Sequence, residues 1–168
     1  MSIEILSIDK VIYDGLIACT PLFTLYNALN PAILPVGANN IAAAVFSDIA
    51  PLKTKTPWII FGHHQNSDTN AMGGFRALEN ATYIIKCCGL GLGYGGLKPF
   101  MDAIDFMMVG DTSGGTSNGL GFTVDAPNGI TVYGFQRLNV IRMAEYIDDQ
   151  PWYQLGAVYQ TVTAQTIS

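Results

Sequence analysis

The chain has 168 residues, with 8 Lys and Arg against 13 Asp and Glu, and a net charge of −5. Charged residues make up 12% of it and hydrophobic residues 49%, whereas a soluble globular domain usually has roughly 25% charged residues. Because the cations are few and scattered singly, the composition argues against nucleic-acid binding. It favours a protein whose uncharged surface is covered by other subunits. A well-packed, sparingly charged monomer is the alternative.

Neither a membrane span nor a signal peptide is expected. Lys86 and several glycines interrupt the longest apolar stretch, 81–97, whereas a spanning helix needs about 20 apolar residues. The N-terminus carries Glu4 and Asp9 and lacks a basic region. The three cysteines, two of them adjacent, do not form a disulfide framework. They are typical of free thiols in a reducing cytoplasm.

Two helices are predicted first, over about 7–18 and 20–29, which together make an N-terminal helical region of about 7–30. Apolar residues recur at three- and four-residue spacing in the first of them, as on one buried helix face. They are Ile8, Val11, Ile12, Leu16 and Ile17. Thr20 suits the N-cap of the second helix, and Pro21 suits its first turn.

From about residue 40 the apolar period changes to two, which predicts strands. They are expected at 41–46, 58–62, 81–88, 122–124, 130–135, 140–147 and 155–163. A glycine-rich turn over 89–96 leads to a helix near 98–109, with Pro99 in its first turn. We therefore predict one α+β domain over 1–168. Its single antiparallel or mixed sheet, with the mid-chain helix, spans about 40–165 and has helices packed on one face.

The polar segment 63–80 is expected to be a long loop or an extended hairpin tip. Met72, Phe75 and Arg76 form an apolar and cationic trio inside this otherwise polar segment. We predict that these three side chains contact another subunit or ring.

The stretch 91–96 reads Gly-Leu-Gly-Tyr-Gly-Gly and matches the G-x-G-x-x-G pattern of dinucleotide-binding folds. Such a site needs a second, parallel strand after the helix that ends near an acidic residue, and Asp111 has about the right spacing. However, the helix and that strand would both have to fit between Leu97 and Gly110, which is too short. A phosphate loop is also excluded, because Leu97 stands where Lys is required. We interpret the stretch as a flexible turn.

The remaining candidates for chemistry are adjacent pairs and isolated acids. His63 and His64 are neighbours, as are Cys87 and Cys88, and neighbours on an extended chain point to opposite sides. A mixed His–Cys metal site or nucleophile pair across two strands stays an open alternative. The acids form no recognisable catalytic pair; they are Asp102, expected near a helix N-terminus, Asp105, Glu145, and Asp148 and Asp149, expected in a turn. We therefore predict no catalytic, cofactor-binding or metal-binding residues and no enzymatic activity.

The order of elements resembles the tail-completion, or tail-terminator, proteins of long-tailed bacteriophages. The similar passages are 40–46, 55–62, 81–86, 100–108 and 154–162, which span most of the chain from about residue 40. The long segment 110–128 and the glycine-rich turn before the helix depart from that family's pattern.

This resemblance implies a minor tail or neck protein that forms a ring, commonly a hexamer, which caps the tail tube and joins it to the head. The implied partners are further copies, the tail tube protein, a head-closure or neck protein, and double-stranded DNA that passes through the lumen without specific binding; no membrane and no cofactor are implied. Such a protein belongs to the virion and is assembled in the host cytoplasm. The alternatives are another neck ring, such as a head-closure or adaptor protein, and a small cytoplasmic nucleotide- or metal-dependent enzyme.

Overall fold

The computed structural model describes residues 3–29, 33–51, 54–70, 76–110, 119–120, 124–125, 130–147 and 149–165. Its helices are α1 (Ile3–Ala18), α2 (Thr20–Asn27), the 3-10 helix η1 (Ala42–Ala44) and α3 (Gly93–Val109). Its strands are β1 (Val45–Ser47), β2 (Trp58–Asn70), β3 (Arg76–Leu90), β4 (Val124–Asp125), β5 (Ile130–Ile147) and β6 (Gln150–Gln165).

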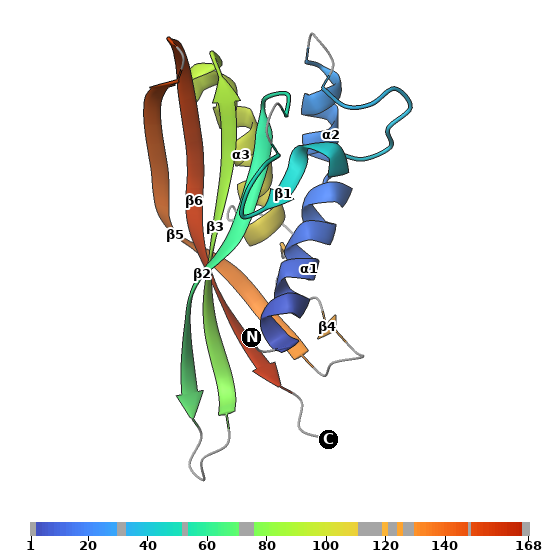
Figure 1. Cartoon of the computed structure of the whole chain (residues 1–168). Coiled ribbons are helices and arrows are strands. Elements are labelled where there is room, and N and C mark those ends of the chain that lie inside the picture. The colour runs from blue at the N-terminus through green and yellow to red at the C-terminus, as the bar shows by residue number, and fades with distance from the viewer. Residues whose placement is uncertain are drawn as a thin grey trace.

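One six-stranded sheet, in the order β1-β2-β3-β6-β5-β4, forms the framework. All neighbouring strands are antiparallel except β1 and β2, which are parallel. The α-helices lie on one side of this sheet (Figure 1), with α3 against β3, β5 and β6, and α1 against β1 and β2. The predicted α+β class, with a mixed sheet and helices on one face, is confirmed.

The core lies between the helices and the helix-facing side of the sheet. Ile59 and Phe61 of β2, Tyr83 and Ile85 of β3, and Tyr159 of β6 are at most 3% exposed, as alternation along a strand requires. The helices contribute Ile8, Ile12 and Leu16 from α1, Leu22 and Tyr26 from α2, and Leu97, Phe100, Ile104 and Met108 from α3. The rings of Tyr26 and Phe100 meet edge to face at 5.1 Å between centroids and join α2 to α3.

The predicted N-terminal helices are present, with small shifts at their ends. The α1 helix begins at Ile3, and its predicted buried positions Ile8, Ile12 and Leu16 have no exposed surface. In α2 the N-cap is Cys19, which makes no side-chain capping hydrogen bond, so the prediction that Thr20 is the N-cap is wrong by one residue.

Three predicted strands, at 41–46, 130–135 and 140–147, differ from the structure, whereas the segment 63–80 follows the second of its two expectations, an extended hairpin. Residues 42–44 form η1 rather than a strand, because the Asn40 side chain accepts a hydrogen bond from the Ala42 N–H at 3.0 Å and starts a tight turn. The segment 63–80 is largely an extended hairpin, since β2 continues to Asn70 and β3 starts at Arg76. The two strands predicted between 130 and 147 are one strand, β5, whose irregularities near residues 132–139 let it stay paired with β6.

The mid-chain helix begins earlier than predicted, at Gly93, so Pro99 lies inside it rather than in its first turn. The glycines at the start of α3 are poor helix formers. Gly89, at the end of β3, lacks a side chain and so permits close packing against this helix. A Cβ on Gly89 would lie 2.9 Å from the side chains of both Leu92 and Leu97. The end of β3 can therefore approach the start of α3, and this tertiary contact outweighs the low helix propensity of the glycines.

Candidate assembly interface

The strand β5 forms an open edge of the sheet over most of its length. It pairs with β6 along its inner side, whereas β4 pairs only with Ile130 and Thr131. Among the described residues, the outer side of β5 from residue 132 to 147 has no partner strand. Such an edge presents a row of unpaired N–H and C=O groups that another chain can extend.

The side chains of β5 make this edge apolar on both faces. Leu138, Val140, Met143, Tyr146 and Ile147 are between 44% and 80% exposed. By register with β6, Val140 lies opposite Ala157 on the helix-facing side, whereas Met143 lies opposite Gln154 on the other side. Both faces of the strand thus offer apolar area, which is unusual for an edge strand surrounded by water.

The face of the sheet away from the helices is not covered by any helix in the described part of the chain. Its side chains alternate with those of the core and are half-buried; they include Ile60, Ile84, Val158 and Ile141. At one end of this face Trp58 and Trp152 lie with their ring centroids 4.8 Å apart. Lys86, Gln154 and Gln160 lie on the same face, so its apolar side chains are interspersed with polar ones.

A groove separates α3 from β5 on the helix side. One hollow of about 490 Å³ is lined by Asp102, Asp105, Phe106, Val109, Gly110, Gln136 and Arg137. A second, of about 280 Å³, shares Asp102, Asp105 and Arg137 with it and continues toward Tyr94 and Arg142. The guanidinium of Arg142 lies 6.0 Å from the centre of the Tyr94 ring, within the range of a cation–π contact.

Asp105 is the charged centre of this groove. Its carboxylate accepts hydrogen bonds from the Arg137 guanidinium of β5 and the Tyr159 hydroxyl of β6. Burial, followed by the hydrogen bond to Asp105, raises the pKa of Tyr159 well above its usual range, so the phenol stays protonated. Because both partners are engaged with Asp105, the cluster ties α3 to the two strands, which is a structural role.

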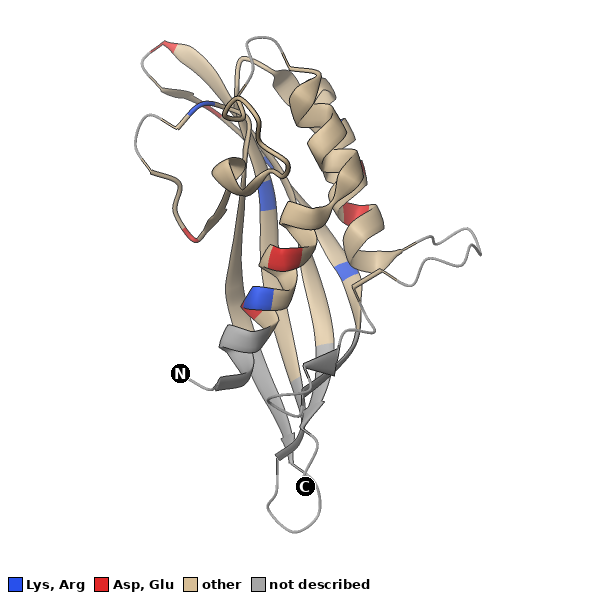
Figure 2. Cartoon of the chain, turned by 90° about the vertical axis from the view of Figure 1, so that its right-hand side faces the viewer, with Lys and Arg blue, Asp and Glu red and all other residues tan. Residues whose placement is uncertain are grey.

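Charged side chains are sparse and scattered over the described residues (Figure 2). Lys10 pairs with Asp14, Lys98 with Asp102, and Arg137 with Asp105. Asp102 therefore acts as an ion-pair partner in the middle of α3, not as a charge at the N-terminus of the helix. None of the described helices combines the length and apolar content needed to cross a bilayer.

The open alternative of a His–Cys site across β2 and β3 is not supported by the strand register. His63 lies opposite Tyr83, whereas Cys87 and Cys88 lie opposite Ile59 and Trp58. Four to five residues along a strand separate the two types of side chain, or about 13 Å and more. Among the described residues, no group of three or more His, Cys, Asp and Glu side chains is placed to hold a metal ion.

The glycine-rich stretch lies at the start of α3, but the fold around it is not that of a dinucleotide site. That site requires a parallel strand beside the strand that precedes the helix. The strand before α3 is β3, and both of its neighbours, β2 and β6, are antiparallel to it. Asp149 lies in the tight turn between β5 and β6, as predicted, with φ 59°.

The predicted contact trio falls largely outside the described residues. Met72 and Phe75 lie between the described ranges 54–70 and 76–110, and Arg76 is the first residue of β3, with no described side chain. The sequence did not lead us to predict the exposed apolar side chains of β5. Their signal was present, because the run 138–147 carries apolar residues at both odd and even positions, as a strand with two apolar faces does.

No protein-family model and no curated protein matches this sequence. Among solved structures, the chain is similar in fold to a chain of a structure described as the virion of a native gene transfer agent (GTA) particle. The TM-score is 0.54 at 13% sequence identity, and the match covers 88% of this chain and 95% of the other. At this level of identity the likeness defines a shared fold, and it extends over almost the whole of both chains.

Proposed function

We propose that this chain is a structural, non-enzymatic subunit of a phage-like virion, which forms a homo-oligomeric ring that ends the tail tube and joins it to the head or neck. The observation that carries the proposal is the likeness to a chain from a virion particle over 88% of this chain. The open, apolar β5 edge supports it, because a strand of this kind is suited to a protein that is covered by neighbours.

The work of such a subunit is assembly. Each copy buries apolar surface against the next, and the two ends of the ring meet the tail tube protein and a head-closure or neck protein. The net charge of −5 suits a ring through which double-stranded DNA slides, because anionic walls do not hold phosphates. The subunit is assembled in the host cytoplasm and becomes part of the virion.

Another neck ring, such as a head-closure or adaptor protein, is the second candidate. The description of the similar structure names a whole particle, so the same likeness supports either position. The two candidates differ in the step that fails when the subunit is missing. Without a terminator, tube growth is not stopped; without a closure ring, the filled head is not sealed.

Deletion of the gene from the particle-producing genome, followed by electron microscopy, tests the proposal. We expect headless tails of irregular, excessive length, and restoration of uniform particles by the gene supplied in trans. Tails of normal length beside emptied heads would favour a closure ring. Rings should also form from the purified wild-type chain or on purified tail tubes. A chain that stays monomeric with and without tubes, and whose deletion leaves particles unchanged, would overturn the proposal.

A further inference from the structure

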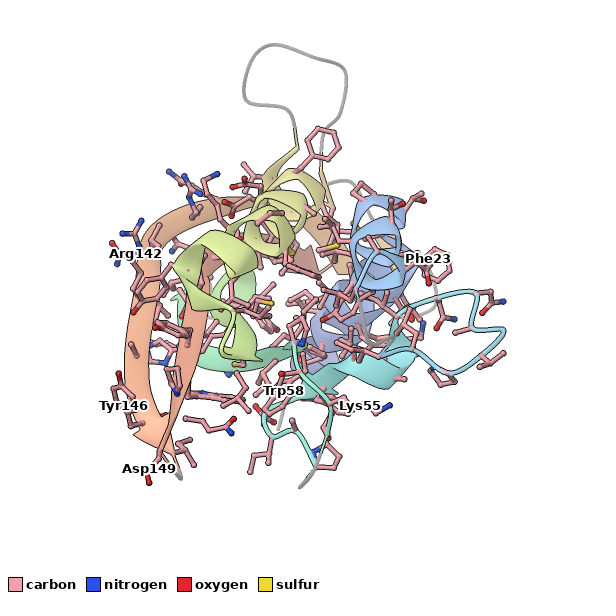
Figure 3. The ribbon with its side chains drawn as sticks, turned by 90° about the horizontal axis from the view of Figure 1, so that it is seen from above. Phe23, Lys55, Trp58, Arg142, Tyr146 and Asp149 are labelled. Carbon is pink, nitrogen blue, oxygen red and sulfur yellow. The ribbon has the colours of Figure 1, made fainter. Side chains whose placement is uncertain are left out.

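The free edge of β5 lies beside a groove whose other wall is the helix α3. β5 supplies Val140 and Arg142 to the second hollow described above, of about 280 Å³, and α3 supplies Tyr94. Figure 3 shows Arg142 and Tyr146 along β5 at the margin of the molecule, on the side away from Phe23 of α2. A helix beside an open strand edge is an arrangement in which an extended peptide can join the sheet and place every second side chain in the groove.

The groove contains one cation that the chain does not neutralise. Lys98 and Arg137 line it, and they are paired with Asp102 and Asp105. Arg142 is exposed and pairs with no carboxylate of the described residues. An exposed guanidinium without a partner at the rim of a groove favours an anionic group in the molecule that fills the groove.

Beside this cation the groove is apolar. Val140 is 54% exposed, and Phe106, which lines the adjoining hollow of about 490 Å³, is 49% exposed. Gly156 contributes to the lining without a side chain and leaves space there. Val140 and Arg142 are two residues apart and face the same side, so an added strand would set two of its own side chains, also two residues apart, beside them. The segment that fits therefore carries an acidic residue and an apolar residue at this spacing.

We propose that an extended segment of another protein adds to the outer edge of β5 as an extra strand, with an acidic side chain at Arg142 and an apolar side chain at Val140. Such an addition satisfies the free N–H and C=O groups of β5 between residues 132 and 147. Under the proposed function this protein is another component of the virion, and in that respect the inference rests on the proposed function.

A second copy of this chain fits the edge less well. In the described part of the sheet the other long free edge is that of β2 beyond Phe61, because β1 pairs only with Ile59 to Phe61. Residues 62–70 read Gly-His-His-Gln-Asn-Ser-Asp-Thr-Asn, in which the one acid, Asp68, has asparagine two residues away on either side. That edge lacks the acidic and apolar pair, so the occupant is expected to be a different chain.

A fluorescent peptide tests the strand addition. The probe is a capped peptide of about nine residues with one glutamate and two valines at alternate positions between threonines, made in both sequence orders. We expect one order to bind saturably in an anisotropy titration, with Kd below about 1 mM. In an extended strand successive residues direct their N–H groups to opposite edges, so N-methylation of alternate residues blocks one edge only. One methylated series should lose binding and the other should keep it.

Variants of the protein test the acidic position. Arg142→Gln should weaken binding about tenfold, because it removes the charge opposite the glutamate. A peptide with glutamine in place of glutamate should lose a similar factor, and Arg142→Gln should then cause no further loss. Lys55→Gln is the charge-matched control, because it removes one positive charge from an exposed site far from β5 (Figure 3) and should bind like wild type. Both replaced side chains are exposed, so the circular dichroism spectra should match that of wild type.

The inference fails if both methylated series bind equally, if Lys55→Gln weakens binding as much as Arg142→Gln, or if neither sequence order binds up to about 1 mM. Release of the peptide as the wild-type chain assembles would show that a second copy occupies the edge, and would overturn the assignment to another protein. In each of these cases the formation of wild-type rings would leave the proposed function standing. Peptide binding by a chain that never assembles would remove the proposed function alone.

Discussion

Cys87 and Cys88 are consecutive residues near the end of β3, with side chains on opposite faces of the sheet, and both are at most 2% exposed. Burial raises the pKa of the Cys87 thiol well above its usual value and that of Cys88 to about 11. The reactive species is the thiolate. Two factors therefore protect both thiols from chemical modification: reagents reach them poorly, and they stay protonated. In the native state they act as apolar packing residues.

We expect the folded protein to resist a thiol reagent such as DTNB at neutral pH, with less than one thiol titrated within minutes. The same protein in denaturant should show all three thiols. As a control, Tyr146→Cys adds one exposed thiol that reacts at once. Rapid reaction of Cys87 or Cys88 in the folded wild-type chain would contradict the buried arrangement.

Asp9 of α1 is half-buried, and its buried Oδ1 has no hydrogen-bond partner. Burial raises the pKa of its carboxyl above the ordinary value of 3.8, while the nearby Tyr83 side chain and the charge of His63 act in the opposite direction. The folded state therefore holds this proton more tightly than the unfolded state. The stability gained from it is complete below pH 3.8 and is lost as pH rises through the folded-state pKa.

Asp9→Asn should consequently be neutral or stabilising at pH 7, where the wild-type carboxylate is charged and partly buried. The difference in unfolding free energy between the variant and wild type should shrink as the pH is lowered toward the ordinary pKa of 3.8. Urea denaturation of both proteins at several pH values measures it. A variant that is clearly less stable than wild type at pH 7 would show that the charged form is favoured instead.

At the scale of elements, two glycines differ in how much space surrounds them. Gly156 of β6 lies between β3 and β5, and a Cβ there would be 2.5 Å from the Ile85 carbonyl oxygen and 2.8 Å from the Lys86 side chain. Gly95 lies in α3, where a Cβ would meet no atom within 4 Å. The same substitution therefore has opposite consequences in the two elements.

Gly156→Ala should lower the unfolding free energy by about 1–3 kcal/mol, because the backbones of three strands would have to move apart. Gly95→Ala should raise it by roughly 0.5–1 kcal/mol, because alanine favours the helix. Thermal unfolding of the two variants beside wild type gives both signs in one experiment. Equal effects of the two substitutions would be inconsistent with the packing described for Gly156.

Some elements could be predicted from the sequence because their signal is local. The spacing of Ile8, Ile12 and Leu16 identifies the buried face of α1 without reference to anything else. The start of α3 could not be predicted, since it depends on how close Gly89 comes to Leu97. The continuity of β5 was also hidden, because the polar residues Gln136, Arg137 and Asn139 indicate a break in the strand unless their pairing with β6 is known.

At the scale of the whole molecule, the ion pairing of the cations disfavours binding to DNA. Lys10, Lys98 and Arg137 are engaged by aspartates, and the net charge is −5. We expect no binding of a 30-base-pair duplex by anisotropy at about 0.15 M salt, where even non-specific DNA binders have Kd near 10⁻⁴–10⁻⁶ M. A basic DNA-binding protein serves as the positive control. Saturable, salt-dependent binding would argue against a lumen through which DNA slides freely.

By itself the sequence determined the α+β class, the buried helix faces and the shortage of charge, because each depends on composition or on the period of apolar residues within one segment. Only the tertiary structure decided which strands end the sheet, and thereby left the outer side of β5 from residue 132 to 147 without a partner strand in the described part of the chain. Strand order is a non-local property. Pairing joins residues far apart in the chain, so the same apolar run can be a buried central strand or an exposed edge.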